Sequence, residues 1–429
     1  GSMASSTRLS PPRDGSVETH LHCMGPWAWR LDFQRVHVST MSSSAFFAYG
    51  ALLTLASGTV YVGSLASLRT PEATKALRKE KGLKETDDDE EEVQGVSSEG
   101  AWMFPLLGSA VLVSLFLAFK YLDKEMIILI VNIYFAVVGC LAIPPVLLHL
   151  CKMAFGSHSL DWCTKRALSF KGHVSWTTPS TKKNLYDTVI KLDSATMGLF
   201  VVVVVLMAIY MYTKHWVLAN IIAVCFAMQG LSLILLDSFQ TGLILLGGLF
   251  LYDIFWVFGS SKFAGQSVMV SVATNFDGPI KILAPRNLLE VLSSVQEKGW
   301  TAADAFQFSL LGLGDIVVPG AFAALALAFD QHHASTKARS LTFNRFFYKF
   351  PKPYFHACMV GYVLGLFTTM VVMHIFKTGQ PALLYLSPSC SLSVLFVAWY
   401  RGELLDMWSW VSPASQGAPK TAPDDKKQA

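Results

Sequence analysis

The stretch Thr241–Gly259, TGLILLGGLFLYDIFWVFG, contains one charged residue, Asp253, in an otherwise uncharged and mostly apolar run. A helix needs about 20 such residues to cross the core of a bilayer, so this stretch predicts a membrane span. An aspartate inside a span costs about 3 kcal/mol and normally faces the protein interior or a water-filled cavity. Asp253 is therefore a candidate functional residue.

A second aspartate, Asp315, lies in the sequence LGLGDI (residues 311–316), within a predicted span over residues 305–328. With a helical rise of 1.5 Å per residue, Asp253 lies roughly 18 Å from a helix start at Thr241. Asp315 lies roughly 15 Å from a start at Ala305, on a helix that returns from the opposite side. These depths coincide near the middle of a ~30 Å core, so we expect the two carboxyls to meet.

Two carboxyls that share a site of low dielectric constant cannot both ionise readily, so one keeps its proton while the other is a base. Such a pair can activate a water molecule for attack on a peptide carbonyl. The sequence does not decide which of the two aspartates carries the proton, because they titrate as a unit.

Three residues beside the aspartates are further candidates for the site. Gly312 and Gly314 permit either a close backbone approach at Asp315 or simple helix packing. Tyr252 can hydrogen-bond a carboxyl or a substrate, or it can serve as a packing residue or interfacial anchor. Both interpretations of each residue stay open at this stage.

The whole chain has the composition of a membrane protein. Of its 429 residues, 52% are hydrophobic and only 15% are charged, which is too apolar for an ordinary soluble protein of this size. We predict an all-α polytopic membrane protein with nine transmembrane helices. The predicted spans cover residues 45–67, 103–120, 126–151, 194–213, 217–236, 241–259, 305–328, 354–376 and 381–400.

These spans divide the chain into four predicted parts. An N-terminal tail, residues 1–44, precedes the first five spans in 45–236, whose acidic loop 68–102 we expect to be a disordered, solvated linker. A catalytic region with the last four spans covers 237–405, and a C-terminal tail covers 406–429. Between spans six and seven, the alternation in residues 268–272, VMVSV, predicts a short strand. This strand is either part of a surface hairpin or has an edge that pairs with an unwound substrate.

The distribution of basic residues predicts the orientation. The N-terminal tail and the even-numbered loops hold 12 Lys and Arg, whereas the odd-numbered loops and the C-terminal tail hold 22. Because cytoplasmic loops retain these residues, we expect the C terminus in the cytosol and the N terminus in the lumen. The chain ends in Lys426-Lys427-Gln428-Ala429, which has the spacing of a dilysine signal for retrieval to the endoplasmic reticulum.

Several other classes of site and partner lack support in the sequence. The basic residues form no continuous stripe, so we expect no nucleic-acid partner. Five of the seven cysteines lie in apolar runs, and Cys23 and Cys163 are isolated, so we expect neither a metal site nor a disulfide framework. We expect no cofactor beyond a catalytic water. The opening Gly1-Ser2 looks like a cloning remnant before Met3, and no signal peptide follows it.

Three motifs in the late spans carry a resemblance to a known family. Tyr252-Asp253, GLGD (residues 312–315) and QPAL (residues 380–383) together resemble the motifs of the presenilin and signal peptide peptidase family of intramembrane aspartyl proteases. The resemblance implies that Asp253 and Asp315 are catalytic and that Gln380, Pro381, Ala382 and Leu383 form a motif that helps to shape the active site and bind substrate. From spacing alone, Pro381 marks an ordinary helix start.

The resemblance also implies a fold and a substrate class. The fold would be a nine-helix bundle with spans six, seven and nine around the aspartates. The substrates would be type II membrane segments, chiefly leftover signal peptides in the endoplasmic reticulum membrane, and the enzyme would assemble as a homo-oligomer. The predicted orientation matches the signal peptide peptidases, since presenilins insert in the opposite sense.

Two alternatives remain at this stage. One is a signal-peptide-peptidase-like protease of the Golgi or endosomes, against which the short N-terminal tail and the dilysine signal argue. The other, from a different class, is a proton- or ion-coupled transporter, because buried acids also relay protons and coordinate cations.

Overall fold

The computed structural model describes most of the hydrophobic part of the chain. The described residues are 43–69, 77, 79–82, 96, 98–155, 170–175, 187–192, 194–260, 262, 268–269, 272, 278–286, 308–337, 350–376 and 380–412. All of them belong to one compact unit, Ser42–Ala429. The predicted N-terminal tail, the acidic residues 85–92 and the dilysine pair Lys426-Lys427 lie outside the described residues.

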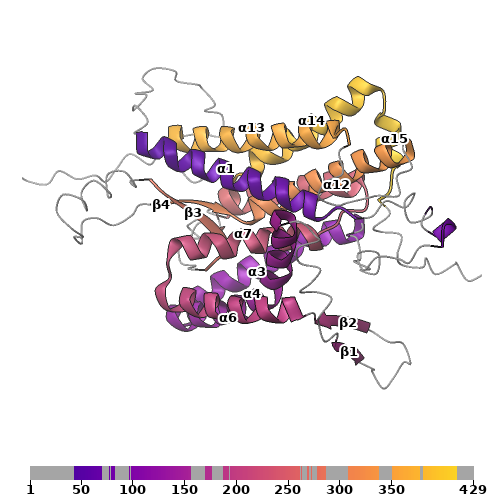
Figure 1. The fold of residues 1–429 in the computed structure, drawn as a ribbon. Coiled ribbons are helices and arrows are strands. Elements are labelled where there is room, and N and C mark those ends of the chain that lie inside the picture. Colours follow the sequence, from indigo (N-terminus) through magenta and orange to yellow (C-terminus); the bar gives the residue numbers. More distant parts are fainter. Residues whose placement is uncertain are drawn as a thin grey trace, which may run out of the picture. The chain divides into compact units, whose positions relative to one another are not determined.

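Nine long helices form the bundle in the described part of the chain (Figure 1). Their bounds are α1 (Ser43–Ala66), α3 (Ser98–Tyr121), α4 (Lys124–Phe155), α6 (Ser194–Thr213), α7 (Trp216–Leu233), α8 (Phe239–Ile254), α12 (Gly314–Lys337), α13 (Pro353–Phe376) and α14 (Leu383–Arg401). A π-helical turn, η2 (Phe255–Gly259), continues α8, and a short helix, α15 (Leu404–Ser409), follows α14.

Each predicted span corresponds to one of these helices, and the all-α prediction is confirmed. Among the described residues, eight helices are long and apolar enough to cross a membrane, and Met197–Thr213 in α6 is a shorter apolar helix. Most helix ends agree with the prediction within a few residues, but α3 begins at Ser98, five residues before the predicted span and inside the predicted loop 68–102.

The seventh predicted span, 305–328, was placed wrongly. Residues Phe308–Gly312 form a strand, β4, and helix α12 begins only at Gly314. Glycines at 312 and 314 are poor helix formers, and the apolar residues before them pair with another strand instead. The helix then continues to Lys337, nine residues beyond the prediction, and its polar residues Asp330, Gln331 and Ser335 are buried inside the protein.

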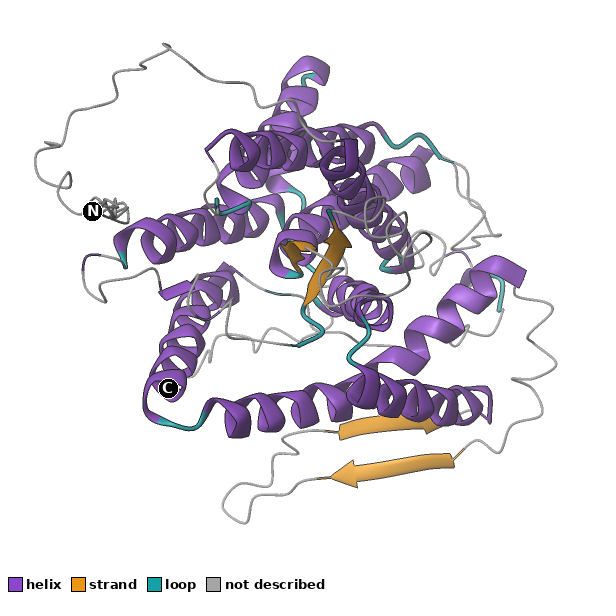
Figure 2. Ribbon diagram, turned by 90° about the vertical axis from the view of Figure 1, so that its left-hand side faces the viewer, coloured by secondary structure: helices purple, strands orange, loops and turns teal. Residues whose placement is uncertain are grey.

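The strand partner of β4 is β3 (Lys281–Pro285), with which it forms an antiparallel pair. Figure 2 shows this pair among the helices. The strand predicted over 268–272 was wrong, since Val268, Met269 and Val272 are helical. A second antiparallel pair, β1 (Phe170–Ser175) and β2 (Asp187–Leu192), lies in the polar segment between α4 and α6.

Helix α12 is the centre of the bundle. It packs against α1, α7, α8, α13 and α14. In its apolar, membrane-spanning stretch 72% of the residues are buried, compared with 11% in the corresponding stretch of α3. Its apolar run from Ala321 to Leu327 is buried almost completely. The position of α12 therefore sets the position of the helices around it.

Two glycines bring α13 and α14 into close contact along their length (Figure 1). A Cβ atom at Gly361 would lie 2.6 Å from the carbonyl oxygen of Ser389, and one at Gly365 would lie 3.1 Å from the Cα of Leu386. The spacing of four residues is the small-xxx-small pattern that lets membrane helices pack backbone to backbone.

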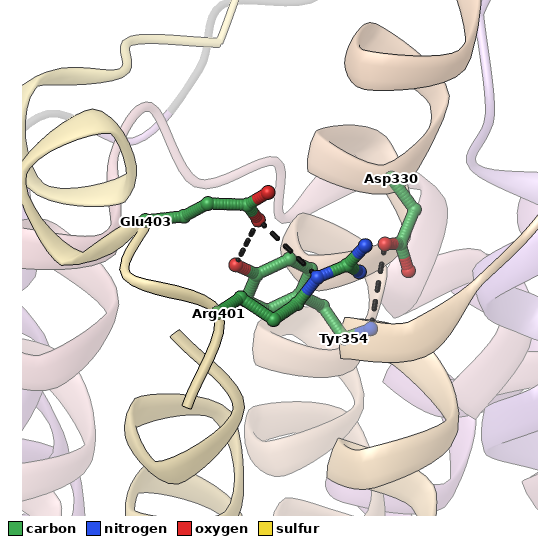
Figure 3. Close-up of polar contacts among 4 residues, drawn as sticks. All are labelled: Asp330, Tyr354, Arg401 and Glu403. Atoms are coloured by element: carbon green, nitrogen blue, oxygen red, sulfur yellow. Dashed lines mark hydrogen bonds and ion pairs between the residues drawn. The ribbon is translucent and has the colours of Figure 1, made fainter. Parts of the chain in front are cut away.

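A polar cluster fastens the far end of α12 to α13 and α14 (Figure 3). The buried carboxylate of Asp330 accepts hydrogen bonds from the backbone N–H groups of Tyr354 (3.3 Å) and Phe355 (2.9 Å). It thus caps the first turn of α13, whose N–H groups have no partner within the helix. The Tyr354 hydroxyl donates to Glu403 Oε2 (2.6 Å), and Arg401 Nε lies 3.6 Å from the same oxygen.

We expect Gly361→Ala to separate α13 from α14, because the added methyl group has no room beside Ser389. Overpacking of this kind costs about 1–3 kcal/mol, so the melting temperature in detergent should fall. Gly58→Ala is the matched control, since a Cβ atom at Gly58 in α1 meets no atom within 4 Å. Equal melting temperatures for the two variants would contradict the tight α13–α14 contact.

We expect Asp330→Ala to destabilise the bundle by about 1–3 kcal/mol, because two buried N–H groups of α13 lose their acceptor. Asp330→Asn keeps one acceptor oxygen and should lose less. Thermal unfolding in detergent compares the two variants with the wild type. An alanine variant as stable as the wild type would show that the cap at α13 contributes nothing.

Candidate active site

Asp253 lies on α8 and is 3% exposed. Fourteen residues separate it from the helix start at Phe239, which places it ~21 Å along the helix axis. The π-helical turn η2 begins two residues later at Phe255. Such turns are rare in proteins overall, but those that occur are often at functional sites. They change the direction of the side chains that follow.

Asp315 lies close enough to Asp253 for their carboxyls to interact electrostatically. It does not lie in mid-helix, as the depth argument assumed, but in the first turn of α12, directly after the strand β4. The unsatisfied N–H groups at a helix start carry a partial positive charge. This position therefore offsets part of the repulsion between the two carboxyls.

The third motif meets Asp253 through its backbone. Pro381 and Ala382 are buried and precede α14, and the backbone N–H of Leu383, the first helical residue, hydrogen-bonds the Asp253 carboxyl. The next two N–H groups are occupied, since Leu384 donates to the Pro381 carbonyl and Tyr385 to the Ala382 carbonyl. The Leu383 N–H is the donor left for Asp253, so both carboxyls lie at a helix N-terminus.

A proline leaves the backbone carbonyl of Asp315 without its helical donor, and a tyrosine takes the donor's place. Pro319 lies four residues after Asp315 in α12 and lacks the N–H that would normally bond the Asp315 carbonyl. The hydroxyl of Tyr362, a fully buried residue of α13, donates to this carbonyl at 3.4 Å. Sequence reasoning missed Tyr362, although a tyrosine in the middle of a span needs a partner for its hydroxyl.

The other predicted site residues differ in what they contact. A Cβ atom at Gly312 would lie 3.4 Å from Asp315 Oδ2, so this glycine leaves room for the carboxyl, whereas Gly314 faces open space. Gln380 lies just before Pro381 and is half-buried. The Tyr252 ring packs beside Gly108 of α3, 3.6 Å from the position of a Cβ atom there, and no hydrogen bond joins its hydroxyl to another described residue.

Two further polar contacts near the aspartates were not predicted. Trp256 in η2 donates from Nε1 to Ser109 Oγ in α3 at 3.0 Å, which fastens α3 to the helix that carries Asp253. Asn220 of α7 hydrogen-bonds both backbone groups of Leu283 in β3. The sequence offers a signal only for Asn220, a polar residue within an apolar span.

The arrangement can perform acid/base chemistry on a water molecule with two carboxyls alone. Among the described residues, no group of three or more His, Cys, Asp or Glu side chains could hold a metal ion. The aspartates lie where α8 meets the starts of α12 and α14. The strand β4 immediately precedes α12 and therefore Asp315.

Comparison with known proteins agrees with this arrangement. The family model described as signal peptide peptidase matches residues 88–414. The signal peptide peptidase of Mus musculus is 36% identical over 363 residues, which cover 85% of this chain and 82% of the mouse protein. The human signal peptide peptidase is 35% identical over 363 residues, with 85% and 83% covered. A probable intramembrane protease of Schizosaccharomyces pombe is 33% identical over 326 residues, with 76% and 87% covered.

These matches extend over most of the chain, and the range matched by the family model contains all three motifs. They favour proteolysis over the transporter alternative, since every relative named here is a protease. The protein is a multi-pass membrane hydrolase, and the chain belongs to the signal peptide peptidase family of intramembrane aspartyl proteases.

Proposed function

We propose that Asp253 and Asp315 are the catalytic pair of an endopeptidase that cuts type II membrane segments, chiefly leftover signal peptides in the endoplasmic reticulum membrane. The observation that carries the proposal is the meeting of the two carboxyls between α8 and the start of α12. The names of the mammalian relatives support the substrate class.

The reaction follows from one ionised and one protonated carboxyl. The carboxylate takes a proton from water while the water oxygen attacks the peptide carbonyl carbon, and the protonated partner donates to the carbonyl oxygen. The tetrahedral intermediate then breaks its C–N bond as the carboxyl that took the proton from water donates it to the nitrogen, and the partner carboxylate takes a proton back from the intermediate's hydroxyl. Water is the second substrate, and no metal or organic cofactor is needed.

The strand β4 offers a place for the substrate backbone. In an antiparallel pair, residues alternate between pairs that exchange hydrogen bonds and pairs that do not. Leu313 N–H donates to the Ile280 carbonyl, so Ile280 and Leu313 form a hydrogen-bonded pair. Leu283 and Leu310 pair three positions further along, which makes them a pair without mutual hydrogen bonds, and their N–H and C=O groups point away from the partner strand. The N–H and C=O of Leu310 therefore face the outer edge of β4, and an unwound substrate segment can pair with them.

The motif at the start of α14 supports the site in two ways. Pro381, Ala382 and Leu383 place a backbone donor on Asp253, and they lie beside the position of the carboxyls where a substrate would pass. Gln380 extends this motif, whereas Gly312 and Gly314 leave room for the substrate backbone at Asp315. Tyr252 contributes as a packing residue toward α3.

The proposed orientation places the C terminus in the cytosol and the N terminus in the lumen. The excess of Lys and Arg in the odd-numbered loops and the C-terminal tail supports it. In this orientation Lys426 and Lys427 lie on the cytosolic side, where we propose that they act as a retrieval signal. We also propose a homo-oligomer within the bilayer.

We expect Asp253→Ala and Asp315→Ala each to lower cleavage of a signal-peptide substrate by at least about 100-fold, because each removes one half of the acid/base pair. The purified variants are compared with the wild type in a detergent cleavage assay. Circular dichroism and thermal unfolding serve as the folding control. Undiminished cleavage by either folded variant would contradict the assignment of the pair.

We expect replacement of both Lys426 and Lys427 by Ser to move the protein from the endoplasmic reticulum to the Golgi, because the retrieval signal is lost. Fluorescence microscopy of cells that express the tagged protein, with the tag at the N terminus, checks the location. Wild-type protein in the Golgi or endosomes would instead support the alternative location.

A further inference from the structure

The side chain of Asn220 imitates a strand at the free edge of β3. Its Nδ2 donates to the carbonyl oxygen of Leu283 at 2.7 Å, and its Oδ1 accepts from the Leu283 N–H at 2.8 Å. A carboxamide can present an N–H donor and a carbonyl acceptor on the same side, as the N–H and C=O of one residue in a strand do, so it replaces the neighbour that an edge strand lacks.

This contact leads by a short path to Asp315. Asn220 belongs to the buried part of α7, at 8% exposure. Leu283 is the middle residue of β3, which pairs over five residues with β4. Asp315 lies three residues after the end of β4, in the first turn of α12. A shift of β3 along or away from α7 would therefore move the backbone that leads into Asp315.

Among the described residues, the contact leaves one open edge on the hairpin. Leu283 and Leu310 face each other in the register, so the peptide groups of Leu283 point toward Asn220 and those of Leu310 point to the opposite side. With the β3 edge occupied at its centre, the described part of the hairpin offers an added strand a position at β4. Leu310, whose side chain is 50% exposed, lies at that edge.

We propose that Asn220 is a positioning residue for proteolysis: its carboxamide fixes β3 to α7, and through β4 it sets the place of Asp315 and of the substrate strand. The inference rests on the proposed function, because it assigns Asn220 a role in that reaction. Asn220 touches neither carboxyl, so it acts through the hairpin and is not itself catalytic.

A purely structural role for Asn220 is the competing explanation, since any polar side chain in a membrane span seeks a partner. The chain offers a matched comparison in Asn132, a buried asparagine of α4 at 5% exposure. Its Oδ1 has no partner among the described residues. Loss of Asn132 removes a buried carboxamide without a connection to the hairpin.

The test compares Asn220→Ala, Asn220→Asp and Asn132→Ala with the wild type in detergent. Active sites are first counted by titration with a transition-state-analogue aspartyl inhibitor, so that unfolded protein does not contribute. Cleavage of a signal-peptide substrate then gives kcat per active site, and mass spectrometry of the products gives the bonds that are cut. Hydrogen–deuterium exchange follows the backbone of residues 280–286 and 308–313.

We expect Asn220→Ala to lower kcat per active site by about tenfold, which corresponds to ~1.4 kcal/mol in the barrier. The variant should also cut at additional neighbouring bonds and exchange faster in both hairpin segments. Asn220→Asp keeps the acceptor for the Leu283 N–H but loses the donor, so it should show the same changes to a lesser degree. Asn132→Ala should match the wild type in all three measurements.

Unchanged kcat per active site and unchanged cleavage positions in Asn220→Ala would overturn the inference, even if the melting temperature falls. If that variant does not fold, the same result with Asn220→Asp overturns it. The proposed function fails separately, when the wild type cuts no more substrate than Asp253→Ala, and the inference then fails with it.

Discussion

The repulsion between two carboxyls in a membrane interior is the constraint on which the rest of this structure depends. Asp253 and Asp315 interact electrostatically, and neither of their apolar stretches, 241–259 and 305–328, contains a Lys or Arg. The protein supplies helix N-termini in place of cations. Asp315 lies in the first turn of α12, and Asp253 accepts the free N–H of Leu383 at the start of α14. Two half-charges are thus placed where two carboxyls meet.

The packing of the bundle follows from the need to bring two helix starts to one point. Helix α12 supplies the first and lies at the centre, in contact with five other helices. Helix α14 supplies the second, and Gly361 and Gly365 of α13 let it lie backbone to backbone against its neighbour. The N–H groups that lack a partner within a helix occur only in its first turn. A small displacement of α14 along its axis would therefore move the Leu383 donor away from Asp253. Close packing at glycines tolerates little displacement.

The sequence predicted the nine helices because hydrophobic length is a strong signal in membrane proteins. It also indicated which two spans carry the aspartates. It did not predict that Asp315 begins a helix, because apolar residues 308–312 are as compatible with a buried helix as with a buried strand. The decision depends on pairing with residues 281–285, which lie more than twenty positions away. The contact of Leu383 escaped prediction because it uses a backbone group, and that of Asn220 because a polar residue in an apolar span does not reveal which backbone it bonds.

A third carboxylate, the buried Asp330 of α12, shows that the same physical solution serves structure as well as the candidate site. Asp330, fifteen residues after Asp315, accepts the first-turn N–H groups of α13. Helix α12 therefore begins by placing its own N-terminus at a carboxyl and ends by offering a carboxyl to the N-terminus of its neighbour. In lipid, where water cannot satisfy the four free N–H groups of a helix start, each such exchange satisfies a buried charge and a buried helix end together. At Asp253 and Asp315 the starts of α14 and α12 do this in stretches that contain no Lys or Arg, whereas Asp330 also has Arg401 nearby.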